Sequence, residues 1–297
     1  MGLCYPLSMD DQRTLPQNYD GPVCIWDIDK TYLATHFSSF RGLARIPIEF
    51  AVDKQAIAGM PEILRGLRRG PGPSFACTPM YFVSASPPQL RKVLANRMLL
   101  DGVEYDGITS KDWIKTLTQL RPGRLREQIG FKLCALLAGR QRRLLAQEYL
   151  FGDDVEKDAE AYHLYARLIS GTLSSDDAER CMKAKGVHRD DRRCVFALLD
   201  TLPKKKGTVK RIFVHLERRT PPSRFEHLGE LVVPVNGACQ LGLALYETGL
   251  VDRETVVQAY EAVKASSVLT RTSVAGLLAE AHERGLISAG KLRELAL

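Results

Sequence analysis

The sequence predicts an α/β protein in which a mostly parallel sheet lies between two layers of helices. Apolar runs of strand length end in polar residues at 23–31, 80–88 and 148–154, and helical segments such as 60–69 lie between them. Strands that alternate with helices are typical of parallel sheets, whose ligands bind outside the carboxyl ends of the strands. The polar residues that end these runs are therefore the candidates for a functional site.

Asp27 and Asp29 end the first run, Val-Cys-Ile-Trp-Asp-Ile-Asp-Lys-Thr, and Thr31 follows them. We expect a buried strand to deliver both carboxylates to the ligand-binding edge of the sheet. Turn formation or helix capping by the two aspartates is the alternative, because Asp is common at strand ends for both reasons. The order of the features further along the chain favours the first interpretation.

Ser84 ends the second run, Met-Tyr-Phe-Val-Ser-Ala-Ser-Pro-Pro, as Asp27 ends the first. Ser86 and Pro87 suit the first positions of a helix that runs to about Met98. The Ser84 hydroxyl and the amides of the following turn can donate hydrogen bonds to phosphoryl oxygens. A phosphate-binding turn is one interpretation, and an ordinary capping turn between strand and helix is the other.

Lys132 lies near the start of a predicted helix with a largely apolar face, in Gln-Ile-Gly-Phe-Lys-Leu-Cys-Ala-Leu-Leu. A cation is unusual there unless it faces a solvent-filled cleft or an anion. The alternative is a lysine that extends from an amphipathic helix into solvent. The neighbouring acids decide between the two.

Asp153 and Asp154 end the third run, Glu-Tyr-Leu-Phe-Gly-Asp-Asp, and Asp158 lies one helical turn further on. Crowded acids repel one another unless a divalent cation neutralises them, and Mg²⁺ prefers carboxylate oxygens, with water and phosphate in its remaining positions. An acidic helix N-terminus, which the helix dipole favours, would explain these acids one at a time but not their match to Asp27.

In this order and context, the four features resemble the four motifs of the haloacid dehalogenase superfamily. The closer resemblance is to the actin-patch-associated phosphatidate phosphatase family and its bacterial relatives. It rests on Asp-Ile-Asp-Lys-Thr-Tyr-Leu-Ala-Thr, Phe-Val-Ser-Ala-Ser-Pro and Gly-Asp-Asp-Val-Glu-Lys-Asp-Ala-Glu-Ala-Tyr, covering residues 22–170 well and 209–250 loosely. That family usually has an acid at the position of Lys30 and a small residue at that of Asp154, so both differences bear on substrate preference. The resemblance implies a Rossmannoid three-layer αβα sandwich with a minimal cap.

The resemblance also implies a Mg²⁺-dependent phosphomonoester hydrolase that acts through an aspartyl-phosphate. Asp27 would attack phosphorus, and Asp29 would protonate the leaving oxygen and then deprotonate the hydrolytic water. Ser84, Lys132 and Thr31 are the expected phosphate-binding residues, with Thr31 also orienting the loop or Asp29. The expected metal ligands are Asp27, the backbone carbonyl of Asp29, Asp153, and Asp154 or Asp158 as a further or more distant ligand. A phosphatidate-like lipid is the implied substrate, but the residues alone select neither lipid, phosphoprotein nor nucleotide.

Composition predicts a cytoplasmic protein with reduced thiols. No apolar stretch approaches a transmembrane span, and the N-terminal residues lack the blocks of a signal peptide. The seven cysteines are scattered and form neither a disulfide framework nor a Cys-x-x-Cys zinc pattern.

The net charge of +7 gathers in two basic clusters that could attract an anionic membrane surface or nucleic acid. They consist of Arg121, Arg124, Arg126, Arg140, Arg142 and Arg143 around the Lys132 helix, and of Lys204, Lys205 and Lys206. The alternative is that they are solvated faces. The runner-up function is therefore a non-catalytic haloacid-dehalogenase-like module that binds anionic lipid or nucleic acid, although the full set of acids argues against it.

The chain of 297 residues is expected to form a phosphatase domain over 1–250, with a helical insertion at about 171–208, and a helical extension over 251–297. The short intervals between motifs leave room only for a flap near 32–53, so we expect an open cleft. The flap residues expected to touch a substrate are Phe37, Phe40, Arg41 and Arg45.

A recurring pattern predicts helix hairpins beyond residue 170: Gly186, Gly249 and Gly285 end helices, and Asp252 and Ser288 begin the next ones. We expect these hairpins to pack on the sheet domain. A surface that binds a partner protein is the lesser alternative.

Overall fold

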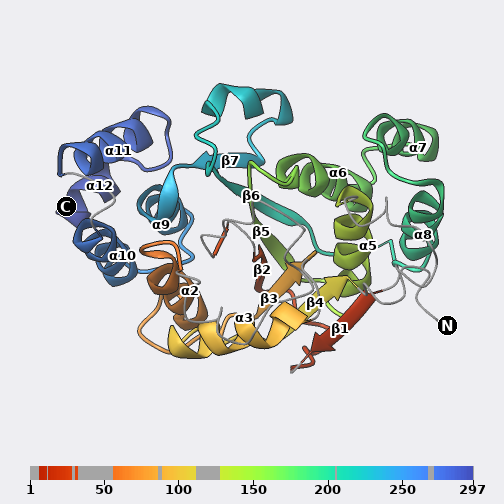
Figure 1. Ribbon diagram of the computed structural model, residues 1–297, viewed down its shortest axis with the longest axis horizontal. Helices are drawn as coiled ribbons and strands as arrows, with labels where there is room; N and C mark the ends of the chain where they lie inside the picture. The colour runs from red at the N-terminus through yellow and green to blue at the C-terminus, as the bar shows by residue number, and fades with distance from the viewer. Residues whose placement is uncertain are drawn as a thin grey trace.

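The fold is mixed α/β, with a seven-stranded sheet in the order β1-β4-β3-β2-β5-β6-β7 (Figure 1). The computed structural model describes residues 7–11, 13–28, 31–32, 56–85, 89–111, 128–204, 206–266 and 271–296. The strands are β1 (Leu7–Asp11), β2 (Pro22–Asp27), β3 (Met80–Ser84), β4 (Gly107–Lys111), β5 (Gln147–Asp153), β6 (Val209–His215) and β7 (Val232–Val235). Only β1 is antiparallel to its neighbour among these strands, so the sheet is mostly parallel, as the sequence predicts.

Helices cover both faces of the sheet, which gives a three-layer architecture (Figure 1). One face carries α5 (Ile129–Arg140), α6 (Asp158–Ser170), α7 (Ser175–Ala184) and α8 (Arg189–Asp200), together with the short helix η3 (Pro222–Leu228). The other carries α2 (Met60–Arg69), α3 (Gln89–Leu100), α9 (Gly237–Glu247), α10 (Arg253–Ala265), α11 (Arg271–Glu283) and α12 (Ala289–Leu295). Because side chains alternate along a strand, Val23 and Ile25 join the first core and Cys24 and Trp26 the second.

Most of the predicted helix ends are found where the sequence puts them. Gly186, Gly249 and Gly285 have φ angles of 77°, 70° and 71°, the left-handed conformation in which glycine ends a helix at no steric cost. Asp252 caps α10, since its carboxylate accepts a 2.9 Å hydrogen bond from the amide of Thr255. Ser288 is the N-cap residue of α12, as predicted, and its carbonyl accepts the first helical hydrogen bond, from the Leu292 amide at 3.0 Å. Its side chain makes no capping hydrogen bond, because its amide and hydroxyl donate to the Glu247 carboxylate of α9.

The helices beyond residue 170 pack on the rest of the molecule. In the insertion, α8 lies against α5, and in the C-terminal part α10 lies against α2 and α9. The α2–α10 contact is close, because a Cβ at Gly66 would lie 2.1 Å from Thr255 Cγ2. Arg69 and Asp252 add a 2.7 Å ion pair between the same two helices. The division into domains at residue 250 stays a prediction.

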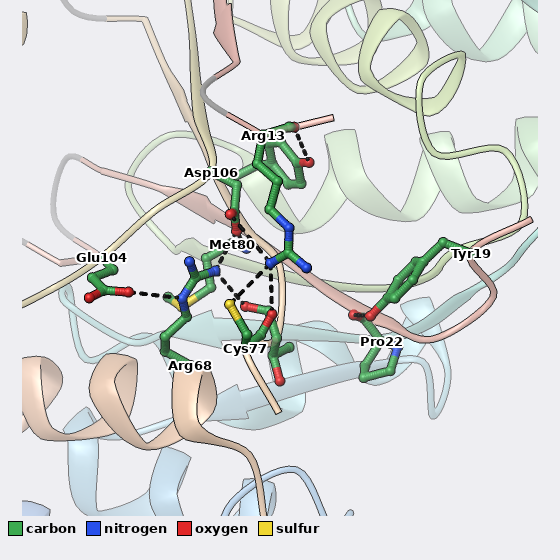
Figure 2. A network of polar contacts seen from close by, with 10 residues as sticks. Arg13, Tyr19, Pro22, Arg68, Cys77, Met80, Glu104 and Asp106 are labelled. Atoms are coloured by element: carbon green, nitrogen blue, oxygen red, sulfur yellow. Dashed lines mark hydrogen bonds and ion pairs between the residues drawn. The ribbon is translucent and has the colours of Figure 1, made fainter. Parts of the chain in front are cut away.

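A network of hydrogen bonds and ion pairs lies at the amino ends of β3 and β4 (Figure 2). The carboxylate of Asp106, just before β4, accepts hydrogen bonds from the Met80 amide at 2.7 Å and from Arg68 Nη1 at 2.6 Å. Arg13 approaches the same carboxylate at 3.6 Å and donates to the Cys77 carbonyl at 3.0 Å. This network ties α2 and the chain before β2 to the sheet, at the edge opposite the strand ends that carry the candidate site.

The predicted basic cluster around the Lys132 helix is wrong for two of its arginines. Arg140 is fully buried and lies 2.6 Å from the Glu148 carboxylate, while Arg143 is buried with its guanidinium 4.0 Å from the centre of the Tyr81 ring. The charges of Arg140 and Arg143 are thus used inside the fold and do not face an anionic partner. Arg142, Lys204 and Lys206 reach solvent to differing degrees.

The expectations for the cysteines, for membrane-spanning helices and for the remaining basic and flap residues have different outcomes. Cys24, Cys77, Cys134, Cys181 and Cys239 are free thiols. Cys194 is disulfide-bonded, so the expectation of reduced thiols is wrong there. Within the described ranges, every helix is too short or too polar to cross a membrane. The remaining basic residues, Arg121, Arg124, Arg126 and Lys205, and the flap residues Phe37, Phe40, Arg41 and Arg45 lie outside the described residues.

Candidate active site

A lysine and four acids meet at the carboxyl edge of the sheet. Asp27 ends β2 and Asp153 ends the adjacent parallel strand β5, so the two carboxylates leave the sheet side by side. Lys132 lies in the first turn of α5, and Asp158 is the first residue of α6. Glu156 joins them from the turn between β5 and α6.

Lys132 is the centre of this cluster. Its Nζ lies 2.9 Å from Asp27 Oδ1 and 3.3 Å from Glu156 Oε2, and it donates a short hydrogen bond to Asp158 Oδ1. Neither Lys132 nor Asp158 is exposed to solvent. Burial alone would lower the pKa of Lys132, but the carboxylates of Asp158 and Asp27 raise it well above its ordinary value. The lysine is therefore a fixed positive charge.

Two carboxylate oxygens of the cluster point into the site without a partner among the described residues. They are Asp27 Oδ2 and Asp153 Oδ2, both buried. Asp153 Oδ1 accepts hydrogen bonds from the amides of Val155 and Glu156, at 2.5 and 2.9 Å. Asp158 Oδ2 accepts from the amide of Asp153. Since an unpaired buried acceptor is costly, the two remaining oxygens are arranged for a ligand.

Burial and mutual repulsion shift the titration of the acids. Burial raises the pKa of Asp27 well above its ordinary value, against the opposing effect of Lys132. Burial, and then the charge of Asp158, raise the pKa of Asp153 to about 8, and burial also raises that of Asp158. One lysine cannot neutralise four carboxylates, so the site favours a further positive charge.

The donor set fits a hard divalent cation. Asp27, Glu156 and Asp158 each offer an oxygen, and these oxygens lie within 4.8 Å of one another. Lys132 already contacts one oxygen of each of the three, however, whereas Asp27 Oδ2 and Asp153 Oδ2 have no partner among the described residues. We therefore regard Asp27 and Asp153 as the stronger pair of metal ligands. The triad of Asp27, Glu156 and Asp158 supplies the counter-charges of Lys132.

Close packing fixes the strands that carry the acids. The Trp26 and Phe151 rings stack at 3.9 Å, and Phe213 stacks on Phe151 at 5.1 Å, which locks β2, β5 and β6 together on the face away from Lys132. Gly152 leaves room for Asp158, because a Cβ there would lie 2.5 Å from Asp158 Cβ. The ring of Tyr162, one turn along α6, has its centre 6.0 Å from Lys132 Nζ.

The remaining site residues from the sequence fall into three groups. Ser84 is buried at the end of β3, the strand next to β2, and Thr31 is buried with no partner for its Oγ1 among the described residues. Asp29 lies outside the described residues. Asp154 turns away from the cluster: its two oxygens accept hydrogen bonds from the amides of Arg218 and Thr220, at 2.9 and 3.2 Å. Of the two further ligands suggested for the metal, the cluster includes Asp158 and not Asp154.

Sequence reasoning missed Glu156 and Tyr162. Glu156 is an acid between Asp153 and Asp158, and its position in a turn that doubles back on β5 places it beside the lysine. Tyr162 follows Asp158 by four residues, the spacing that puts two helical side chains on one face. Both signals were present in the sequence, but they do not point to the site unless the position of Lys132 is known.

Comparison with known protein families gives a match that spans the site. Residues 23–174 match the family model described as phosphatidate phosphatase APP1, catalytic domain. This range contains Asp27, Ser84, Lys132, Asp153 and Asp158. The chain therefore belongs to that family. Neither curated proteins nor solved structures give a significant match.

Proposed function

We propose that the protein is a Mg²⁺-dependent phosphomonoester hydrolase of the haloacid dehalogenase type, acting on a phosphatidate-like lipid. The observation that carries the proposal is the buried cluster in which Lys132 holds Oδ1 of Asp27 while Oδ2 of Asp27 has no partner among the described residues. A carboxylate held at one oxygen and free at the other is suited to act as a nucleophile.

In the proposed reaction, one carboxylate oxygen of Asp27 attacks the phosphorus atom of the substrate. A bond forms between that oxygen and phosphorus, and the bond to the ester oxygen breaks. Asp29 gives its proton to the leaving alcohol and then takes one from the water that hydrolyses the aspartyl-phosphate, which releases inorganic phosphate and restores both acids. The positive charge of Lys132 favours the ionised form of Asp27 and attracts the phosphoryl oxygens.

Asp27 and Asp153, with the backbone carbonyl of Asp29, would hold Mg²⁺, which supplies positive charge against the phosphoryl oxygens. Ser84 and Thr31 would donate hydrogen bonds to those oxygens. Asp158 and Glu156 keep Lys132 in place by their contacts with its Nζ.

The lipid substrate rests on the family and not on the cluster. The name of the matching family supports phosphatidate, and the cluster supports the chemistry of a phosphomonoester. A module that only binds anions at a basic surface would not need a buried excess of acids, so the acids at this edge favour catalysis over the binding module.

The test measures phosphate release with and without Mg²⁺ from phosphatidate, nucleotides, sugar phosphates, a phosphopeptide and an aryl phosphate. We expect Asp27→Asn to lower release by at least about a thousandfold without loss of fold, since it removes the nucleophile. Asp200→Asn makes the same chemical change at an exposed position of α8 and should keep full activity.

Full activity in Asp27→Asn, or release that does not respond to Mg²⁺, would contradict the mechanism. If folded wild type released no more phosphate than Asp27→Asn from any substrate, the binding module would replace the proposal. Its affinity for anionic lipid or nucleic acid should then fall steeply with salt.

A further inference from the structure

A cavity of about 510 Å³ lies between the first turn of α6 and η3, beside the candidate active site. Asp153 at the end of β5 is part of its lining, so the cavity and the acid cluster share a residue. The volume is within the range of ligand sites, roughly 300–1,000 Å³. The cavity is therefore large enough for a ligand group and begins where the catalytic cluster ends.

The exposed side chains that line the cavity are all basic. They are Lys157, Arg218, Arg224 and His227. None of the four side chains has an ion pair or a hydrogen bond to the described part of the chain. The lining also includes three acids that are less exposed: Asp154 and Glu160 are half-buried, and Asp153 is buried in the catalytic cluster. Unpaired arginines and lysines around a hollow attract phosphate and carboxylate groups.

One of the acids in the lining is already engaged in hydrogen bonds. Asp154 lines the cavity, and its two oxygens accept hydrogen bonds from the amides of Arg218 and Thr220. These bonds tie the segment after β6 to the turn after β5, which keeps Arg218 next to the turn. The charge of Asp154 is thus used in building the wall of the cavity.

The N-terminus of α6 adds to the positive potential. Lys157, at the N-cap position, is in the left-handed conformation with φ of 61°, and no side chain caps the helix. Ala159 and Glu160, in the first turn, line the cavity. The amides of the first turn and the positive end of the helix dipole therefore attract anions here, in addition to the four basic side chains.

The turn between β5 and α6 lies between the acid cluster and the cavity. Glu156 and Asp158 contact Lys132 on one side, and Lys157 between them lines the cavity on the other. Consecutive Cα atoms are about 3.8 Å apart. Only a single turn of chain therefore lies between the acid cluster around Asp27 and the cavity.

We propose that this cavity is a subsite for a second anionic group of the same molecule whose phosphoryl group reacts at Asp27, which rests on the proposed function. The second group is phosphate-like and binds to Lys157, Arg218, Arg224 and His227. Phe225 gives the cavity a buried apolar wall, so the anion is attached to a larger body. The preferred substrate class is then a phosphomonoester that carries another phosphate or similar anion.

The test is equilibrium binding, measured by titration calorimetry on the full chain with Mg²⁺ present. The probes are alkane bisphosphonates of increasing chain length and the alkylphosphonates of matching length, which differ only in the second anion. We expect the best bisphosphonate to bind about tenfold or more tightly than its matched monophosphonate. In Arg218→Ala/Arg224→Ala this ratio should fall to about one, whereas Arg219→Ala, an exposed neighbour that does not line the cavity, should keep it.

Three outcomes would overturn the subsite. They are a ratio near one at every chain length, an equal loss of the ratio in Arg219→Ala, and binding of two monophosphonates per chain with no gain from the linker, which would put the second anion on a separate molecule. Because binding needs no turnover, a ratio that depends on Arg218 and Arg224 supports the subsite even where no phosphate is released. Phosphate release together with a ratio near one removes the subsite alone.

Discussion

The same three elements, α5, β5 and α6, build a buried ionic network at each end, and the two networks differ in charge. At the carboxyl edge, Lys132 faces Asp27, Glu156 and Asp158, with Asp153 close by. About 12 Å along α5, Arg140 faces Glu148 of β5, and Tyr165 of α6 donates to the same carboxylate at 2.7 Å. One end has a single cation for four acids, and the other has one cation for one acid.

The difference in charge separates a functional site from a structural one. Burial alone would lower the pKa of Arg140, but Glu148 and then Tyr165 raise it, and Arg140 Nη1 also donates to the Ala146 carbonyl at 2.7 Å. At the other end, burial raises the pKa values of Asp27 and Asp153, the neighbouring acids raise them further, and the single lysine does not offset these effects. The charges of a balanced pair cancel, whereas an excess of buried acid favours a further positive charge.

The largest expected effect concerns Lys132. We expect Lys132→Met to lower phosphate release by about 100- to 1,000-fold, because the site loses its fixed positive charge. The measurement is phosphate release per folded molecule, with circular dichroism as the check on folding. Lys132→Arg keeps the charge and should lose less. A release rate for Lys132→Met within tenfold of wild type would contradict the role of this lysine.

Arg140 should behave in the opposite way. Arg140→Met leaves Glu148 buried without a counter-charge, and we expect it to destabilise the fold by about 3–5 kcal/mol in urea unfolding. Release per folded molecule should stay at the wild-type level. The double variant Arg140→Met/Glu148→Leu should recover most of the stability, because an apolar pair can replace a buried ion pair. If the double variant were as unstable as the single one, the balanced pair would not be the cause.

The sequence anticipated the functional network better than the structural one. Asp27, Asp153 and Lys132 stand where apolar runs end or a helix begins, and a parallel sheet brings such positions together. Arg140 has no comparable signal: it stands among other arginines, and sequence shows charge but not burial. Its partner Glu148 stands at the start of a strand, where an acid is usually exposed.

Two other features show the same limit. The edge strand β1, Leu-Ser-Met-Asp-Asp, was not predicted, because a short strand with two acids has no apolar pattern to reveal it. Glu156 was missed because a single acid in a turn can face either way, and only the Lys132 contact decides its direction. The pairing of β1 with β4 and the contact of Glu156 with Lys132 both join residues that are distant in the sequence, and no local pattern shows them.

The pH dependence of stability in Asp153→Asn should distinguish the acid-rich network from the balanced one. The folded state raises the pKa of Asp153 from 3.8 to about 8, so the folded protein binds this proton more tightly than the unfolded chain. Stability of the wild type should therefore fall as pH rises across that interval. In EDTA at pH 8, we expect Asp153→Asn to be more stable than wild type by about 1–2 kcal/mol, with the difference vanishing near pH 4.

Metal should reverse this order. Mg²⁺ added at pH 8 should stabilise the wild type more than Asp153→Asn, because the variant lacks one of the two free carboxylate oxygens. Thermal unfolding in EDTA and in Mg²⁺, at several pH values, measures both effects. An Asp153→Asn variant less stable than wild type in EDTA at pH 8 would show that the acid excess does not strain the fold.

The smallest expected effect is that of Tyr162→Phe, and Tyr165, three residues further along α6, provides the comparison. The Tyr165 hydroxyl donates to Glu148 and accepts from Arg140 Nε at 3.1 Å, whereas the buried Tyr162 hydroxyl has no partner among the described residues. We expect Tyr165→Phe to cost about 1–3 kcal/mol of stability, since it leaves charged groups short of a hydrogen bond. Tyr162→Phe should be neutral or slightly stabilising, because it removes an unpaired polar group and keeps the ring near Lys132. Urea unfolding of the two variants compares the networks directly, and a larger loss from Tyr162→Phe would mean that its hydroxyl has a partner in the working site.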